Sequence, residues 1–396
     1  VPITIYCSPC FSVYIVRQKT SFRFVALPVQ NFFPCVILRV EDYSDVPTFL
    51  YSSVSKIYLI AVFPFSCLQS CLATKTLGGV LRCDPEVMKP SAKTPDDVNQ
   101  VRPADINVIA AMGDSITASF INYDDDPYNV YPGNSYVIGG DETLEKHISV
   151  ANILRVFNPS IVGMSHGTGY DNTVFNVAVS GRTSMDIPRQ AEELIHRMKA
   201  RGVRLRDDWK LISIFIGTND LGELRCYSKE VREIYKTKLE EGISLLRSNL
   251  NRTIVSIVSM WNPELTIDAR SLIEEGWAFF YFTCFMSKIR FHFVAYELQN
   301  ERRFDHKDFT VVVQGFMDDI KDAFRNKSGE YDKSFYASDV FHLSKYGNAV
   351  VGKFLWNNLI EPVDQKTTKA DLGNDDFPIK CPSKVCLYVF YTPCLK

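Results

Sequence analysis

Five runs of mostly apolar residues are spaced along the chain, and the stretches between them mix polar and apolar positions. The runs are Asn107–Met112, Val174–Val179, Leu211–Ile216, Thr253–Met260 and Phe309–Val313. They are rich in β-branched residues and almost uninterrupted by charge, which is typical of strands buried on both faces of a sheet. Each run is therefore predicted to be a core strand.

Several of the intervening stretches show helical spacing. Ala191–Ala200 follows Pro188, and proline is favoured in the first turn of a helix. Ser228 can cap a helix that runs to Leu250, and Val340–Leu359 is the last helical region. Strands that alternate with helices predict a parallel sheet covered on both faces. We therefore expect an α/β fold with five parallel strands and a functional crevice beyond their carboxyl ends.

Composition changes along the chain and indicates where the folded domain lies. Residues 1–82 have few charges and many aromatic side chains, and 276–296 share this character inside an otherwise ordinary region. The folded domain is predicted at 83–382, with 276–296 as an atypical insert, and 1–82 and 383–396 remain unassigned. Non-coding sequence read through as protein would look like the aromatic stretches, although a membrane-contacting surface is an alternative.

Overall charge and composition narrow the class of partner. The 396 residues are 46% hydrophobic and 23% charged, with a net charge of −2. These proportions are typical of a soluble globular protein, and the absence of a basic surplus argues against a nucleic-acid partner.

Cysteines and possible glycosylation sites bear on the compartment. Cys83 and Cys381, two of eleven cysteines, flank the predicted domain, and a disulfide between them would suit an oxidising compartment. Asn251 and Asn326 each begin an Asn-x-Ser/Thr acceptor sequence. Both features favour a secreted protein or one on the extracellular face of a membrane.

Residues with chemical capacity follow three of the predicted strands. Gly-Asp-Ser occupies 113–115, Ser-Gly-Arg occupies 180–182 and Gly-Thr-Asn-Asp occupies 217–220. Taken alone, Ser115 could simply cap the next helix. A nucleophilic serine needs a base, and the chain has six histidines from which one could come.

His342 is the best candidate for that base, because Asp339 precedes it by three residues. A carboxylate at this spacing can reach Nδ1 of the imidazole and leave Nε2 free to accept the serine proton. The alternative is that Asp339 only caps the following helix.

Two further residues could stabilise a developing oxyanion. Gly181 offers a backbone N–H that a substrate can approach closely, and Asn219 offers a side-chain amide. Each could instead be an ordinary turn residue. Together with Ser115, Asp339 and His342, however, they complete the set of groups that acyl transfer requires.

These motifs resemble those of the SGNH, or GDSL, hydrolases. The matching blocks are GDSI at 113–116, the glycine of FNVAVSGR at 181, GTND at 217–220 and DVFH at 339–342. Flanking stretches such as VRPADINVIAAMGDSITA and DWKLISIFIGTNDL are most similar to the membrane-associated phospholipase B group. The resemblance covers about residues 83–382.

The resemblance implies a flavodoxin-like, three-layer α/β/α domain that hydrolyses acyl esters with no metal, nucleotide or other cofactor. Ser115 would attack the ester carbonyl, His342 would act as base and then acid, and Asp339 would orient it. The Ser115 N–H, the Gly181 N–H and the Asn219 side chain would bind the oxyanion. The motif residues expected to support the loops are Gly113, Asp114, Gly217 and Asp220.

The implied substrates are phospholipids and lysophospholipids presented by a membrane or micelle. One alternative is an esterase of the same fold that acts on small esters or carbohydrate esters. Another is a non-catalytic binding module or a misassembled product of a faulty gene model, which the aromatic stretch at 276–296 suggests.

Overall fold

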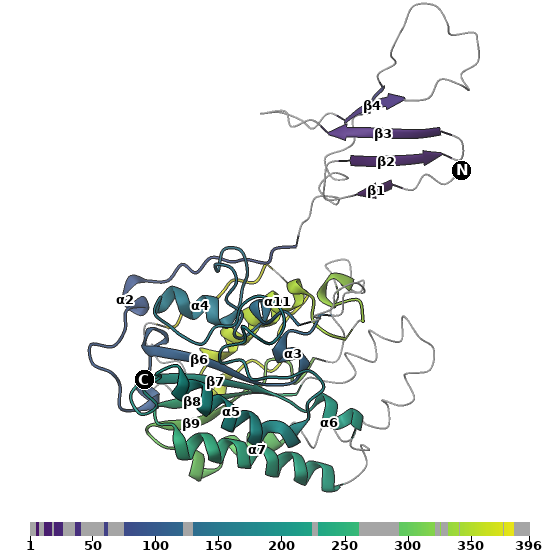
Figure 1. Cartoon of the computed structure of the whole chain (residues 1–396). Helices are drawn as coiled ribbons and strands as arrows, with labels where there is room; N and C mark the ends of the chain where they lie inside the picture. Colours follow the sequence, from purple (N-terminus) through teal and green to yellow (C-terminus); the bar gives the residue numbers. More distant parts are fainter. Residues whose placement is uncertain are drawn as a thin grey trace, which may run out of the picture. The chain divides into compact units, whose positions relative to one another are not determined.

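A computed structural model of the chain divides into two compact units, Val1–Lys75 and Thr76–Lys396 (Figure 1). The structure describes five strand segments before residue 62, followed by residues 75–121, 130–223, 229–260, 293–320, 325, 332–339, 341–374 and 376–383. Most of the stretch 276–296 and almost all of the tail 383–396 lie outside these residues.

The strand segments of the first unit form one antiparallel sheet in chain order. Its strands are β1 (Ile5–Cys7), β2 (Ser12–Arg17), β3 (Thr20–Ala26), β4 (Val36–Val40) and β5 (Leu59–Ala61). The sequence pattern left this part of the chain unassigned.

Four strands form a parallel sheet within the described residues of the second unit, in the order β6-β7-β8-β9. They are β6 (Ile106–Gly113), β7 (Trp209–Phe215), β8 (Thr253–Val258) and β9 (Phe309–Gln314). Nearly every residue of these strands is buried, which agrees with their apolar runs. The predicted α/β class is confirmed.

The fifth predicted strand, Val174–Val179, forms only an isolated bridge between Asn176 and Ala111 of β6. The sheet therefore has four strands in the described residues, not the five expected. The backbone turns at this point: Val174 has a φ of 51°, and the Asn176 N–H bonds to the Thr173 carbonyl. The segment still lies along the free edge of β6, so the order matches the flavodoxin-like 2-1-3-4-5 arrangement.

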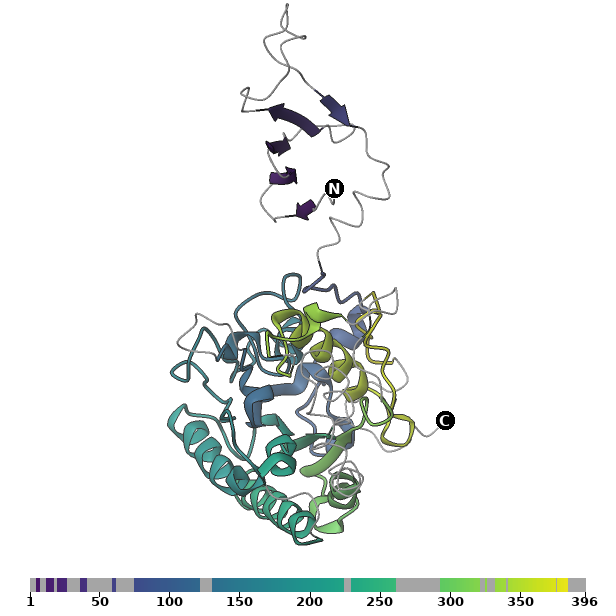
Figure 2. The same cartoon turned by 90° about the vertical axis from the view of Figure 1, so that its right-hand side faces the viewer.

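Helices cover both faces of the parallel sheet. Figures 1 and 2 show α4 (Val150–Phe157) and α11 (Lys345–Leu359) on one face, with α5 (Ile187–Ala200) and α7 (Lys229–Asn249) on the other. The shorter helices are α2 (Pro85–Met88), α3 (Ser115–Ala118) and α6 (Thr218–Glu223). The 3₁₀ turns are Val98–Gln100, Pro103–Asp105, Pro132–Asn134, Ser184–Asp186, Arg302–Phe304, Lys333–Phe335 and Val363–Gln365. The domain thus has the three layers of an α/β/α fold.

The last helix begins five residues later than the predicted start at Val340. Ser344 caps α11, because its side chain accepts the N–H of Gly347. Asp339 and His342 consequently lie in the turn before the helix rather than in its first turn.

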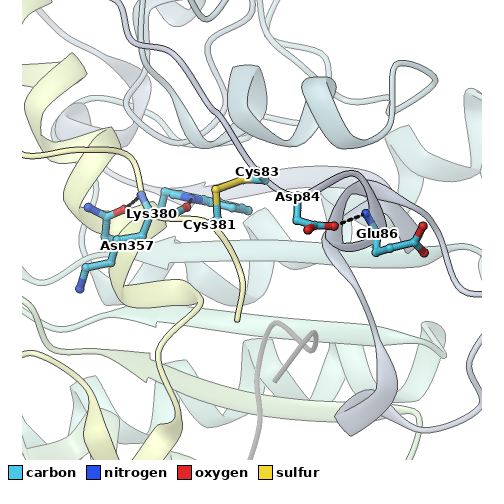
Figure 3. The surroundings of a disulfide bond; sticks show 7 residues. Cys83, Asp84, Glu86, Asn357, Lys380 and Cys381 are labelled. Atoms are coloured by element: carbon cyan, nitrogen blue, oxygen red, sulfur yellow. Dashed lines mark hydrogen bonds between the residues drawn. A yellow bond between two sulfur atoms is a disulfide. The ribbon is translucent and has the colours of Figure 1, made fainter. Parts of the chain in front are cut away.

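Cys83 and Cys381 are joined by a disulfide, with their Cα atoms 5.5 Å apart (Figure 3). On one side the chain enters α2, which Asp84 caps by accepting the Glu86 N–H. On the other side the chain follows α11, where Lys380 donates its N–H to Asn357 and accepts the indole N–H of Trp356. The disulfide therefore links the beginning of the second unit to a segment that is already bonded to its last helix.

Removing this disulfide with a Cys83→Ala/Cys381→Ala double variant is expected to lower the free energy of unfolding by about 3–5 kcal/mol. The bond closes a loop with a sequence separation of 298, so it restricts the unfolded chain strongly. Urea unfolding of both proteins, with and without reductant, measures the effect. Reductant should destabilise the wild type more than the variant, and equal midpoints for the oxidised wild type and the variant would contradict the expectation.

Candidate active site

The turn after β6 places Ser115 at the start of a helix. Gly113 must be glycine, because a Cβ there would stand 2.2 Å from the carbonyl oxygen of Phe215 on the neighbouring strand. Asp114 then caps α3 by accepting the Ile116 N–H at 3.0 Å. Ser115 is the first residue of α3, where no intrahelical carbonyl is available to its N–H. Strand, glycine and cap together present the Ser115 side chain beyond the carboxyl edge of the sheet.

His342 lies between Ser115 and Asp339. Its Nε2 is 2.8 Å from Oγ of Ser115, and its Nδ1 is 2.5 Å from Oδ2 of Asp339. The other Asp339 oxygen accepts the N–H groups of Phe341 and His342, so the carboxylate is held by its own turn. Burial alone would raise the pKa of Asp339, but the hydrogen bonds from His342 outweigh it and the pKa is lowered. Asp339 is therefore charged at neutral pH.

Two aromatic rings fix the plane of the His342 imidazole. The ring of Phe120 lies 4.6 Å from it between centroids, and that of Phe341 lies 4.8 Å away, nearly perpendicular. Only 13% of the His342 side chain is exposed. Sequence patterns do not single out Phe120, because nothing in the residues just after Ser115 indicates that its ring packs against a histidine from a distant turn.

Gly181 and Asn219 approach each other through the residue that follows Gly181. The amide nitrogen of Asn219 donates to the Arg182 carbonyl at 2.9 Å, which occupies one of its two N–H groups and orients the other. Gly181 has a φ of 74°, and a Cβ added there would have no described atom within 4 Å. Space for a small group is thus available in front of this backbone.

Asp220 links the segment after Gly181 to the helix that contains Asn219. Its carboxylate accepts the Ser184 N–H at 3.1 and 2.9 Å and also accepts the Ser184 hydroxyl. Asp220 lies in α6, directly after Asn219, and Gly217 is the residue immediately before this helix. The partner Ser184 carries no recognisable motif in the sequence. This buried contact joins the segment that follows Gly181 to the helix that carries Asn219.

Asp114 is the other buried carboxylate of the motifs, and fewer of the described hydrogen bonds reach it than reach Asp220. One oxygen caps α3, but Oδ2 has no hydrogen-bond partner within the described part of the chain. Burial, with a smaller contribution from the charge of Asp220, raises the pKa of Asp114 to about 7. Asp114 therefore shapes the turn beneath Ser115 and is poorly suited to carry a permanent charge.

A groove of about 540 Å³ lies along α5, and Val179 and Arg182, which flank Gly181 in the sequence, belong to its lining. Its lining carries both signs of charge and comprises Val177, Val179, Arg182, Asp186, Arg189, Gln190, Glu192, Glu193, His196 and Arg197. Arg182 connects the groove to Asn219 through the hydrogen bond described above.

The remaining sequence candidates are separate from this arrangement. Asn251 is half-buried, and its Nδ2, the atom that would carry a glycan, donates to Asp308; Asn326 lies outside the described residues. No group of three or more metal-ligating side chains stands together in the parts of the chain that the structure describes. No described helix combines the length and apolar character that crossing a bilayer requires.

Comparison with known proteins supports the resemblance inferred from the motifs. The chain is 33% identical over 327 residues to phospholipase B1, membrane-associated, of Homo sapiens, a match that covers 76% of this chain and 22% of the human protein. The protein of the same name from Rattus norvegicus is 33% identical over 334 residues, covering 74% of this chain and 22% of the rat protein. The chain thus spans about a fifth of the length of these curated relatives.

Among solved structures, the lipase Lip_vut3 from a goat rumen metagenome is similar at 15% identity and a TM-score of 0.37, covering 63% of this chain and 95% of that one. The family described as GDSL-like lipase/acylhydrolase matches residues 109–355, which include the Gly-Asp-Ser turn and the Asp-x-x-His turn. Because this match extends over more than half of the chain, the protein belongs to the GDSL-like lipase/acylhydrolase family.

Proposed function

We propose that this chain is a serine esterase that hydrolyses the acyl ester bonds of phospholipids and lysophospholipids. The observation that carries the proposal is the continuous hydrogen-bonded series from Ser115 through His342 to Asp339. In this arrangement the neutral imidazole accepts the Ser115 proton at Nε2 while Oγ attacks the ester carbonyl. The Asp339 carboxylate accepts the Nδ1–H and favours the imidazolium that forms.

The oxyanion of the tetrahedral intermediate would be held by three N–H donors. These are the backbone groups of Ser115 and Gly181 and the free amide hydrogen of Asn219. The imidazolium then returns its proton to the leaving alcohol, and a water molecule activated by the same imidazole releases the fatty acid from the acyl-enzyme. Apart from the ester and the water molecule, every group in this cycle belongs to the chain.

Two observations support a lipid rather than a small ester as substrate. The curated relatives are named phospholipases, and the groove along α5 presents both positive and negative side chains. A zwitterionic headgroup could pair with both signs at once. The disulfide between Cys83 and Cys381 supports a secreted protein or one on the extracellular face of a membrane.

The proposal is tested by fatty-acid release from phosphatidylcholine and lysophosphatidylcholine by the full chain and by Ser115→Ala. Loss of the nucleophile is expected to lower turnover by about 10⁴-fold or more. Equal release by the two proteins would rule out Ser115 as the nucleophile. A short p-nitrophenyl ester assayed in parallel separates the alternative: a rate that jumps above the micellar threshold of the lipid favours the phospholipase, whereas a preference for the short ester favours the small-ester enzyme.

A further inference from the structure

The side-chain amide of Gln190 bonds twice to a single backbone residue at the carboxyl end of β6. Its Oε1 accepts the Gly113 N–H at 2.7 Å, and its Nε2 donates to the Gly113 carbonyl at 2.8 Å. Gln190 lies near the start of α5, is 5% exposed and stands 77 positions from Gly113 in the sequence. Buried side-chain amides need hydrogen-bond partners, and here one amide finds both its donor and its acceptor partner on the backbone of a single residue.

Gly113 is the residue at which such a pairing has the greatest effect. It has to be glycine because of the close approach of the Phe215 carbonyl, and glycine has the most freedom of any backbone position. Its carbonyl also accepts the Val179 N–H, but at 3.3 Å, and its N–H has Gln190 as partner. The Gln190 amide therefore sets the direction of both peptide groups of Gly113.

We propose that Gln190 is a positioning residue for Ser115. The inference rests on the proposed function, in which Ser115 is the nucleophile. Ser115 follows Gly113 by two residues, and its Oγ has to remain within hydrogen-bond reach of His342, 2.8 Å away. Because a misplacement of about 1 Å at a reacting atom can lower a rate by about 100-fold, a tether on Gly113 controls catalysis without touching the substrate.

The chemistry of the contact indicates which substitution tests it. A primary amide offers a donor and an acceptor from one rigid group, whereas methionine has a similar length with no donor and only a weak acceptor. Gln190→Met is expected to lower kcat by about 10- to 100-fold with a much smaller change in KM. Gln190 borders the groove, but its side chain is only 5% exposed and both ends of its amide are bonded to Gly113. Labelling of Ser115 by a fluorophosphonate probe should slow by the same factor as kcat.

A matched control separates positioning from general loosening of α5. Met198→Ala removes a fully buried side chain two turns further along the same helix. It is expected to lower the midpoint of thermal unfolding at least as much as Gln190→Met and to leave kcat unchanged. If Gln190→Met does not fold, Gln190→Glu, which keeps the accepting oxygen and loses the donor, is compared with Met198→Ala in the same way.

The results distinguish this inference from the proposed function. Hydrolysis by the wild type that Ser115→Ala abolishes supports the proposed function. Against that background, a Gln190→Met enzyme with wild-type kcat overturns the positioning role alone, as does an equal loss of kcat in Met198→Ala. A wild type without Ser115-dependent hydrolysis overturns both.

Discussion

Replacing His342 with alanine is expected to lower kcat for ester hydrolysis by about 10⁴- to 10⁶-fold, with a much smaller change in KM. The Ser115 hydroxyl is a weak nucleophile at neutral pH, and His342 Nε2, 2.8 Å away, is the base within reach. The imidazole also supplies the proton that the leaving alcohol needs, so both halves of the reaction depend on it. The rate of fluorophosphonate labelling should fall together with kcat.

Asp339→Asn is the informative companion variant, with an expected loss of about 10⁴-fold in kcat. Asp339 uses one oxygen for two backbone N–H groups and the other for His342 Nδ1. Asparagine has a single oxygen, which the backbone groups retain, so its NH₂ group then faces Nδ1. The histidine must accept that hydrogen bond at Nδ1 and carry its proton at Nε2, where it cannot take the proton of Ser115.

His166 provides the matched control for both variants. It is also paired with an aspartate, since its Nδ1 lies 3.4 Å from Asp141, but it is about half exposed and makes no described contact with Ser115. His166→Ala should retain wild-type kcat. Wild-type turnover in a folded His342→Ala enzyme, or an equal loss in His166→Ala, would contradict the assignment of the base.

The features that were predictable from the sequence depend on neighbours close in the chain. Asp339 and His342 are three residues apart, so their pairing follows from the geometry of one turn. Strands β7 and β8 are buried on both faces, so each appears in the sequence as a continuous apolar run whichever elements pack against it. Parallel topology then brings Ser115 and Asn219 to the same edge of the sheet.

The features that were not predictable depend on contacts between distant residues. Val174–Val179 has the composition of a strand, but its turn at Asn176 reduces the pairing with β6 to one bridge. The contact of Gln190 with Gly113 and that of Ser184 with Asp220 join polar residues that would be equally plausible at the surface. Local patterns show which residues can form hydrogen bonds, whereas the fold decides with which partner.

Asp114→Asn is expected to stabilise the folded protein, and to do so only above the pH at which Asp114 ionises in the unfolded chain. The pKa of this carboxyl is raised from 3.8 to about 7, mainly by burial, so the folded state holds a proton that the unfolded state releases. Its contribution to stability is complete below pH 3.8 and is lost as the pH rises through about 7. Asparagine can keep the cap on Ile116 without carrying a charge.

The expected difference in unfolding free energy is therefore close to zero at pH 3.8 or below and reaches about 4 kcal/mol at pH 8, at about 1.4 kcal/mol for each unit of pKa. Asp220→Asn is the matched contrast. The Asp220 carboxylate accepts hydrogen bonds from the N–H and the hydroxyl of Ser184, and the NH₂ group of asparagine would face these donors. This variant should destabilise the protein by about 1–3 kcal/mol. Urea unfolding of the three proteins between pH 4 and 8 tests both signs. Parallel curves for the wild type and Asp114→Asn would show that Asp114 remains charged in the fold, and its unpartnered oxygen would then need a donor that the described residues do not supply.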